Sequence, residues 1–318
     1  MAQPTNSFDS YDQVGIKEDL EDMIYRITPE ETPFYSGIKK TKARNTYHEW
    51  QTDTLRSSAD NKHLEGDDTT ADAATATSRL GNYTQIFKNA VVIPDTDEGL
   101  NKAGRAKELG YQTLKIAKEQ KLDIEKALFD NNARVAGDSS TARELAGAPA
   151  WLITNVNFQS GASGANPTGD GTDARTDDGT PTAFSQTKFD DVMQQIWVSG
   201  GNPDKCFLSA FQMNKALAFT GNNNQRSTID APDKKVIKHM DVYVTPWGTV
   251  EFVPSRENRG RDVFVMDTSM WCVAVLRPTK NTALAKTGDA TKRQVVTELT
   301  LVCKNEAASG IIADNTTS

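Results

Sequence analysis

The side chains that most often catalyse reactions or bind metals are few in this 318-residue sequence, and they stand far apart. The three histidines are His48, His63 and His239. None has a second histidine or cysteine two or four residues away, the spacings that place two zinc ligands on one turn or helix face. His48 and Glu49 fall in a segment with strand character, where adjacent side chains point to opposite faces. The histidines therefore predict neither a catalytic site nor a zinc site.

Oxygen ligands suitable for calcium are gathered in one glycine-rich stretch. Asp170, Asp173, Asp177 and Asp178 lie within nine residues of one another. Their spacing matches neither the EF-hand loop nor the glycine-rich nonapeptide repeat. We interpret the stretch as a flexible acidic loop. A calcium-binding module or a calcium-dependent hydrolase remains as the alternative that this stretch leaves open.

Motifs for nucleophilic or phosphate chemistry are absent from the sequence. It has no Gly-x-Ser-x-Gly elbow, no Walker loop and no Gly-x-Gly-x-x-Gly fingerprint. Cys206, Cys272 and Cys303 are odd in number and widely separated, which predicts buried free thiols in a reducing compartment. Asn82 begins a glycosylation pattern, but a protein without a secretory signal does not meet that machinery. We therefore expect no enzyme activity, no metal and no other cofactor.

Composition and charge exclude further classes. The net charge of -7 and the pI near 5.2 argue against a dedicated nucleic-acid reader. Leu, Ile, Val and Phe make up about one fifth of the residues, which predicts a modest core with polar extensions. No apolar run approaches the length of a membrane-spanning helix, and the first residues lack the basic and apolar regions of a secretory signal. We expect a soluble protein.

The first 36 residues form a polar, acidic segment. They contain eight Asp and Glu residues and only two basic residues. Apolar residues recur with helical spacing from Ile16 to Ile27, which predicts a short helix. Pro29 and Pro33 then end that helix and favour an extended chain. A basic group follows directly, formed by Lys39, Lys40, Lys42 and Arg44.

Residues 46–94 have the pattern of a long β-hairpin. Two stretches, 46–55 and 83–93, are rich in aromatic and β-branched residues and are predicted to pair. Between them, residues 57–78 are small, acidic and rich in threonine. Because so polar a tip cannot bury itself, we expect it to extend into solvent or to lie on another molecule.

Residues 99–132 predict one long helix. The stretch lacks proline, and its small apolar residues repeat with a helical period. Asp95–Glu98 supply acidic residues at the expected start, where the helix dipole favours negative charge. At 1.5 Å per residue, such a helix would be about 50 Å long.

The second half of the chain has the pattern of a compact module that follows a long surface loop at 154–186. One helix is predicted from Thr187, with Asp190 completing a capping box, through an apolar face that ends in Trp197. A second helix is predicted from Ser209 to about Phe219. Strands are expected at 206–208, 236–244, 250–253, 263–266, 270–276 and 295–303. Without regular βαβ alternation, the predicted fold class is α+β.

Three segments carry a resemblance to a known family. They are Ile27–Ser36 (ITPEETPFYS), Asn45–Asp53 (NTYHEWQTD) and Val295–Ile311 (VVTELTLVCKNEAASGI). With the order of polar arm, hairpin, long helix, compact module and late strand, they resemble the major capsid proteins of tailed bacteriophages with the Hong Kong 97-like shell fold. The resemblance covers nearly the whole chain, less securely the 154–186 loop, and its motifs are structural rather than catalytic.

The resemblance implies a division of the chain into the parts of that fold. They are an N-terminal arm at 1–45, an E-loop hairpin at 46–94, the first part of a P-domain at 95–150 with the spine helix at 99–132, an A-domain at 151–275 that includes the loop at 154–186, and a P-domain return strand with the C-terminus at 276–318.

The resemblance also implies a function. The protein would assemble into hexamers and pentamers of an icosahedral head shell that encloses double-stranded DNA. Its partners would be copies of itself, a portal, and scaffold or decoration proteins, without a membrane and without sequence-specific DNA binding. Its location would be the virion capsid, after assembly in the cytoplasm of a bacterial host. An encapsulin-like compartment shell uses the same fold and remains as an alternative.

Charge and covalent chemistry give three further expectations. Acidic residues 9–31 would pair with basic patches such as Lys39–Arg44 on adjacent subunits. The overall acidity would keep the inner wall from binding DNA tightly, because phosphate binding depends on Lys and Arg contacts. Some members of the resembled family join subunits by a Lys–Asn bond, for which Lys62 or Lys88 could supply the amine. No matching acceptor signature occurs near the C-terminus, so we expect no cross-link.

Overall fold

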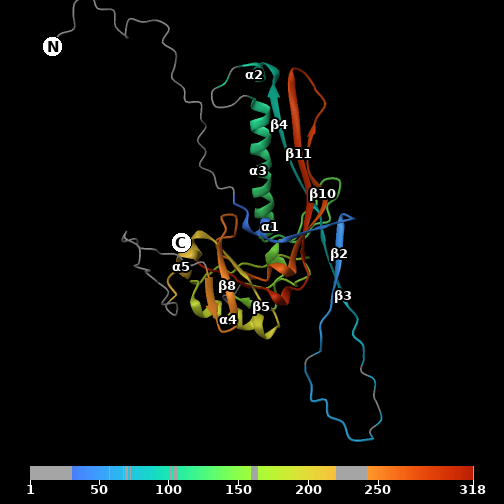
Figure 1. Cartoon of the computed structure of the whole chain (residues 1–318), viewed down its shortest axis with the longest axis vertical. Helices are drawn as coiled ribbons and strands as arrows, with labels where there is room; N and C mark the ends of the chain where they lie inside the picture. Colours follow the sequence, from blue (N-terminus) through green and yellow to red (C-terminus); the bar gives the residue numbers. More distant parts are fainter. Residues whose placement is uncertain are drawn as a thin grey trace, which may run out of the picture.

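The computed structural model describes residues 31–56, 58–66, 68, 71, 73–100, 102, 107–158, 164–219 and 242–317. These residues form a four-stranded sheet, a six-stranded sheet and a two-stranded hairpin, with helices packed against both larger sheets. Figure 1 shows the long helix beside the four-stranded sheet in the upper part, the six-stranded sheet in the lower part, and the hairpin projecting away from both. The predicted α+β class is confirmed.

The four-stranded sheet has the order β1-β10-β11-β4, with strands β1 (Lys39–Lys42), β10 (Trp271–Ala283), β11 (Ala290–Cys303) and β4 (Gln85–Pro94). Only the β1–β10 pair is parallel. Helix α3 (Glu108–Phe129) covers one face of the sheet. The buried Gln120 fixes it there, because its amide donates to the carbonyls of Phe87 at 3.0 Å and Val295 at 3.1 Å.

The six-stranded sheet draws its strands from distant parts of the sequence. Its order is β5 (Asn155–Asn157), β12 (Gly310–Ile312), β9 (Val263–Met266), β6 (Lys205–Leu208), β8 (Gly248–Pro254) and β7 (Val242–Thr245). Helix α4 (Gln186–Val198) buries Phe189, Val192, Met193 and Ile196 against it. Helix α5 (Ala210–Ala216) contacts β6 and β8.

Short elements connect these layers. They are helices α1 (Pro33–Gly37) and α2 (Asp95–Gly99) and the 3-10 turns η1 (Ala148–Ala150), η2 (Thr268–Met270) and η3 (Glu306–Ala308). Strands β2 (Tyr47–Thr52) and β3 (Ser78–Tyr83) form the projecting hairpin. Their register pairs Tyr47 with Tyr83 and Thr52 with Ser78.

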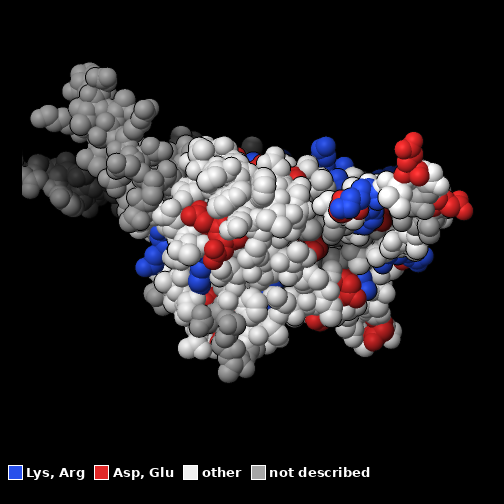
Figure 2. Space-filling view, turned by 90° about the horizontal axis from the view of Figure 1, so that it is seen from below, with Lys and Arg blue, Asp and Glu red and all other residues white. Residues whose placement is uncertain are grey.

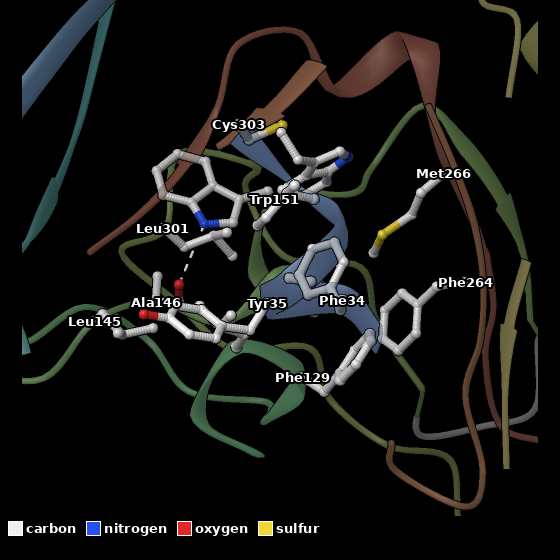
Figure 3. Close-up of a cluster of buried hydrophobic side chains, with 14 of the residues drawn as sticks. Phe34, Tyr35, Phe129, Leu145, Ala146, Trp151, Phe264, Met266, Leu301 and Cys303 are labelled. Carbon is white, nitrogen blue, oxygen red and sulfur yellow. Dashed lines mark hydrogen bonds between the residues drawn. The ribbon is translucent and has the colours of Figure 1, made fainter. Parts of the chain in front are cut away.

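One apolar cluster joins the two large sheets. Phe34 of α1 lies at its centre, with ring centroids 4.9 Å from Phe129 of α3, 5.3 Å from Phe207 of β6 and 6.2 Å from Trp271 of β10. Figure 3 shows α1 passing through this cluster. The root of the N-terminal segment is therefore part of the core.

The predicted helix at 99–132 is wrong at both ends. Asp95–Gly99 forms the separate helix α2, and Leu100 then has an extended backbone, with ψ at 145°. Helix α3 begins only at Glu108 and ends at Phe129, which makes it about 33 Å long. Side chains before α3 hold this break, because Glu98 accepts from the backbone N–H of Leu109 at 3.2 Å.

The predicted pairing of 46–55 with 83–93 is also wrong. Residues 47–52 pair with 78–83, and residues 85–94 form β4, which pairs with β11. The physical reason lies in burial: β4 buries Phe87 and Ile93 under α3, whereas β3 pairs with β2, is buried at Gly81 and Asn82, and is exposed at Ser78 and Arg79 where the ribbon leaves the body. Helix α3 therefore packs against β4 and β11, whereas the projecting hairpin is formed by β2 and β3.

The expectation of a surface loop at 154–186 is wrong for much of that range. Residues 155–157 form β5, and Arg175, Asp178 and Phe184 are all at least 96% buried. Backbone bridges join Ala165 to Thr176 and Thr182 to Asn315. Polar residues here can be buried because they hydrogen-bond to partners inside and outside the segment, such as Asn166 for Arg175 and Asp314 for Asp178.

The predicted cap of α4 is displaced by two residues. Its N-cap is Ser185, whose hydroxyl accepts from the backbone N–H of Lys188, and not Thr187. Trp197 is 58% exposed, because it lies beside the apolar face rather than on it. The cap of α5 by Ser209 is confirmed, although that helix ends at Ala216.

Several strand predictions need adjustment. Residue 275, the expected end of the A-domain, falls within β10. Strand β12 near the C-terminus lies in the six-stranded sheet, whereas β11 lies in the four-stranded sheet. β11 was expected to be half-buried, yet residues 297–303 are all buried, because that end is covered on both faces. The predicted helix at 16–27 and most of the predicted strand at 236–244 lie outside the described residues.

Candidate functional site

The histidines do not come together in the structure. His48 lies half-buried on β2, where burial lowers its pKa, and its ring centroid is 6.2 Å from that of Trp50. His63 lies in the hairpin tip, with its Nε2 2.7 Å from Oδ1 of Asn61. His239 is outside the described residues. The two described histidines therefore share no site.

The three cysteines are buried and free, as predicted. Burial raises the pKa of the Cys206 and Cys303 thiols well above the ordinary value, so neither is a ready thiolate nucleophile. Asn82 is also fully buried. Its amide donates to the carbonyls of Leu301 at 2.9 Å and Ala146 at 3.3 Å, so its glycosylation pattern is inaccessible in the fold.

The acidic residues at 170–178 are held by local partners. Asp170 accepts from the Thr172 backbone at 2.8 Å, and Asp173 accepts from the Thr168 backbone at 2.9 Å. Asp177 forms ion pairs with Arg259 at 2.5 Å and Arg261 at 3.2 Å. Across the part of the chain that the structure describes, no group of three or more His, Cys, Asp or Glu side chains is arranged to hold a metal ion.

A buried ionic network fastens the C-terminal segment. Arg261 pairs with Asp314 at 3.2 Å, and Asp314 also accepts from the backbone N–H of Asp178 at 3.0 Å. Asp262 is fully buried beside Arg259 at 2.7 Å, and its burial raises its pKa to about 6. The network joins the 175–178 segment, the 259–262 segment and residues 314–315 into one rigid unit.

A second buried carboxylate fixes the root of the N-terminal segment. Glu125 of α3 accepts from the backbone N–H groups of Phe34 at 2.9 Å and Tyr35 at 2.6 Å. Those N–H groups belong to the first turn of α1 and have no partner within the helix. Burial raises the pKa of Glu125 to about 7. Glu125 therefore acts as a cap supplied by another helix.

Sequence reasoning missed these buried charges. Glu125 stands between the core residues Ile124 and Leu128 on α3, and a charged residue at an inward position was the only available signal. Glu298 is similar: it lies on the central strand β11 and pairs with Arg143 and Arg277, each at 2.6 Å. Their partners are 21 to 155 residues away, which no local pattern reveals.

The root of the β2–β3 hairpin is rigidly attached. Trp50 of β2 packs on Trp151 with ring centroids 5.3 Å apart, and Tyr47 packs on Tyr83 at 4.6 Å. Gly81 pairs with Glu49, and a Cβ atom at Gly81 would lie 2.6 Å from the Tyr47 ring, so a larger residue there would displace that ring. The direction in which the hairpin leaves the body is thus set by packing.

The tip of the hairpin has the opposite character. Every described residue from Asp53 to Arg79 is exposed, and Leu55 and Leu64 are 98% and 83% exposed. A free two-stranded ribbon with a long polar tip is marginally stable in water, and exposed leucines there gain nothing within the chain. The hairpin tip is therefore a candidate contact surface.

Charge does not define a large single-sign surface on the lower face. Figure 2 shows acidic and basic side chains there in small separate groups, with wide neutral areas between them. Among the described helices, none is long and apolar enough to cross a membrane. The features that stand out are the projecting hairpin, the anchored arm root and the open sheet edges.

Three solved structures that share this arrangement come from two phage capsids and an encapsulin. The fold matches a capsid structure of the cyanophage P-SCSP1u with a TM-score of 0.61 and 10% identity, over 95% of this chain and 94% of that one. It matches Phage G major capsid proteins with a TM-score of 0.55 and 11% identity, over 99% and 100% of the two chains. An encapsulin of Synechococcus elongatus matches with a TM-score of 0.55 and 9% identity, over 96% and 94%. The fold is thus that of Hong Kong 97-like shell proteins.

Sequence comparison distinguishes between a phage capsid protein and an encapsulin within that class. The major capsid protein of Escherichia phage Phieco32 is 30% identical over 98% of this chain and 97% of its own length. The family model of the SU10 major capsid protein matches residues 3–316. The chain therefore belongs to the SU10 major capsid protein family and is a structural component of a phage capsid.

Proposed function

We propose that this chain assembles with copies of itself into hexamers and pentamers that close an icosahedral head shell around double-stranded DNA. The observation that carries the proposal is the β2–β3 hairpin, which is rigid at its root and exposed at its tip, with Leu55 and Leu64 uncovered. Such an extension gains stability by lying on a neighbouring subunit. Extended contacts of this kind also enlarge the interface area that holds a closed shell together.

A surface suited to receive the tip lies on the four-stranded sheet, on the face opposite α3. β4 buries Phe87 and Ile93 towards the helix, so Ile86 and Val92, which are 46% and 51% exposed, point to the other face. Lys88 lies between them, and the register places Lys292 opposite Val92. This apolar, basic surface complements the acidic tip with its two leucines. We assign it as the acceptor for the hairpin of an adjacent subunit.

The division into arm, E-loop, P-domain and A-domain is part of this proposal. The arm comprises 1–45, the E-loop 46–94, the P-domain 95–150 and 276–318, and the A-domain 151–275. The portal, scaffold and decoration proteins, and assembly in the host cytoplasm, belong to it as well, since each follows from the role of a head-shell protein.

Purified chains test the proposal directly. We expect particles of megadalton mass in sedimentation and closed shells in electron micrographs. The double variant Leu55→Asp/Leu64→Asp should fold normally, because both side chains are exposed, and should fail to form shells. The control Ser58→Asp/Thr75→Asp adds the same charge to the same segment but keeps both leucines, and should still assemble. Normal shells from the leucine variant would contradict the assigned role of the hairpin.

An encapsulin-like compartment is the less well supported alternative, because an encapsulin shares the fold with a TM-score of 0.55 but the family match is to a phage capsid protein. Particles from the native source distinguish the two. Double-stranded DNA inside and a portal at one vertex support the head shell, whereas an enclosed enzyme without a genome supports the compartment. We also expect boiled, reduced particles to migrate as a single band, because no cross-link acceptor is predicted. A ladder of multimers would contradict that expectation.

A further inference from the structure

Strand β1 carries a run of basic residues along one edge of the four-stranded sheet. Residues 39–44 read Lys-Lys-Thr-Lys-Ala-Arg, with four basic residues and no acidic residue. β1 is the terminal strand of its sheet and pairs with β10 alone. All four residues of β1 are exposed, and the Arg that follows it is exposed as well. We refer to Lys39, Lys40, Lys42 and Arg44 as the β1 strip.

The charge of the β1 strip is not neutralised by the chain itself. Within the described ranges, none of its four side chains forms an ion pair. Lys40 instead lies with its Nζ 4.3 Å from the centre of the Tyr35 ring, a contact that positions the lysine and leaves its charge in place. Because the whole chain has a net charge of -7, the strip is a local exception to an acidic molecule. Such a surface attracts an anion from outside the chain.

The backbone fixes the spacing of these charges. The ladder between β1 and β10 continues one residue beyond the strand, because the N–H of Ala43 donates to the Val275 carbonyl at 3.0 Å. Side chains alternate between the two faces of an extended strand, so Lys40, Lys42 and Arg44 lie on one face, about 6.6 Å apart along the chain. The strip is therefore a row of cations at regular intervals on a rigid element.

The row matches the anions of a nucleic acid better than those of a protein. Its interval is of the same order as the distance between neighbouring phosphates of one DNA strand. Protein interfaces are depleted in lysine and are built around apolar side chains. The strip has three lysines, and its alanine, Ala43, is only 1% exposed, so no apolar side chain is available to anchor a protein partner.

We propose that the β1 strip contacts the phosphate backbone of double-stranded DNA inside the shell, without reading its sequence. Lysine and arginine contacts to phosphates supply most of the sequence-independent affinity of proteins for DNA. Only three cations share one face, and the chain as a whole is acidic, so each subunit binds weakly and loses affinity as salt is added. The inference rests on the proposed function and names one contact between the shell and its contents.

The first experiment compares mature heads that are filled with DNA with the same heads after they have released it. An acetylating reagent modifies accessible amines, and mass spectrometry measures the extent of the reaction at each lysine. We expect Lys40 and Lys42 to react several-fold less in filled heads than in emptied heads. Lys62 in the hairpin tip is the control, and should react equally in both.

Equal reaction of Lys40 and Lys42 in the two kinds of head would overturn the inference. Strong reaction in both would mean that DNA does not reach the strip. Weak reaction in both would mean that a protein covers it, such as the acidic segment 9–31 of another subunit. Heads that contain no double-stranded DNA contradict the proposed function itself, whereas filled heads with a fully reactive strip contradict this inference alone.

The second experiment measures the binding of dissociated subunits to a short fluorescent duplex of mixed sequence at several salt concentrations. Lys40→Gln/Lys42→Gln/Arg44→Gln should reduce the slope of log affinity against log salt concentration by about 2.7, because each lost phosphate contact removes about 0.9. Since all three side chains are exposed, the variant should keep the melting temperature of the wild type.

The control removes the same number of positive charges from side chains that already have a carboxylate partner. The partners are Glu49 for Arg79, Glu251 for Lys205 and Asp95 for Lys286. Arg79→Gln/Lys205→Gln/Lys286→Gln should change the slope by less than about 0.9, the share of one phosphate contact. An equal reduction in both variants would show that only net charge matters, and would overturn the inference. Wild-type subunits whose binding does not depend on salt would overturn it as well.

Discussion

Truncation of Phe34 to alanine should show that the arm root is part of the core. The Phe34 side chain is fully buried and touches rings from α3, β6 and β10, so its removal opens a cavity between both large sheets. Phe→Ala changes in cores cost about 3–5 kcal/mol, a large part of the 5–15 kcal/mol that stabilises a typical domain. Phe34→Leu, which keeps most of the volume, should cost less than about 1.5 kcal/mol.

Urea unfolding of dissociated subunits measures this effect. Trp151 and Trp271 lie in the same cluster, so tryptophan fluorescence reports on it directly. Leu55→Ala is the matched control: its side chain is 98% exposed, and the change should stay within about 0.5 kcal/mol. A free energy of unfolding for Phe34→Ala within about 1 kcal/mol of the wild type would refute the reasoning, because it would mean that α1 can leave the core at little cost.

Three further predictions concern buried groups and glycines. Burial raises the pKa of Glu125 from 4.5 to about 7, so the folded state binds the proton more tightly than the unfolded state, and this stabilisation is lost as the pH rises from about 4.5 through 7. Glu125→Gln should therefore flatten that part of the curve of unfolding free energy against pH. An unchanged slope would contradict the prediction. A Cβ atom at Gly147 would collide with the Asp130 carbonyl oxygen, so Gly147→Ala should lower the melting temperature by many degrees. Gly110 on α3 has open space around it, so Gly110→Ala should raise the free energy of unfolding by about 0.5–1 kcal/mol. Similar effects of the two substitutions would argue against the packing described. Cys206, Cys272 and Cys303 should react with a thiol reagent only after unfolding, and rapid labelling of the native chain would show that they are accessible.

Sequence patterns correctly predicted the elements whose defining residues lie within a few positions of one another. The spacing of Phe189, Val192, Met193 and Ile196 predicts α4 because a helix face repeats within seven residues. The strand at 263–266 and the cap at Ser209 are local signals of the same kind. The hairpin was assigned the wrong second strand because β4 is rich in strand-forming residues, whereas the adjacent β3 contains few of them. The choice between them depends on burial under α3, which is a tertiary contact.

Buried polar residues were the main source of error. Arg175, Asp178 and Asp262 look like solvent-exposed residues in the sequence, and the 154–186 stretch therefore resembles a loop. Their burial depends on partners up to 136 residues away, such as Asp314 for the backbone of Asp178. The break before α3 has a related cause, since the Glu98 carboxylate accepts from the backbone N–H of Leu109, a contact that no helical periodicity reveals. The exposed hairpin tip was predicted more fully, because its polar composition is visible in the sequence alone.

The position of β12 has a consequence for the order of events during synthesis. Among the described strands, β5 pairs with β12 alone, so residues 155–157 have no described strand to pair with until residues 310–312 have been made. Asp314, which forms an ion pair with Arg261, is synthesised after β12. A nascent chain thus exposes an unfinished sheet edge until it is synthesised past these residues. A product that ends before residue 310 therefore lacks the pairing of β5 with β12 and the link through β12 to β9.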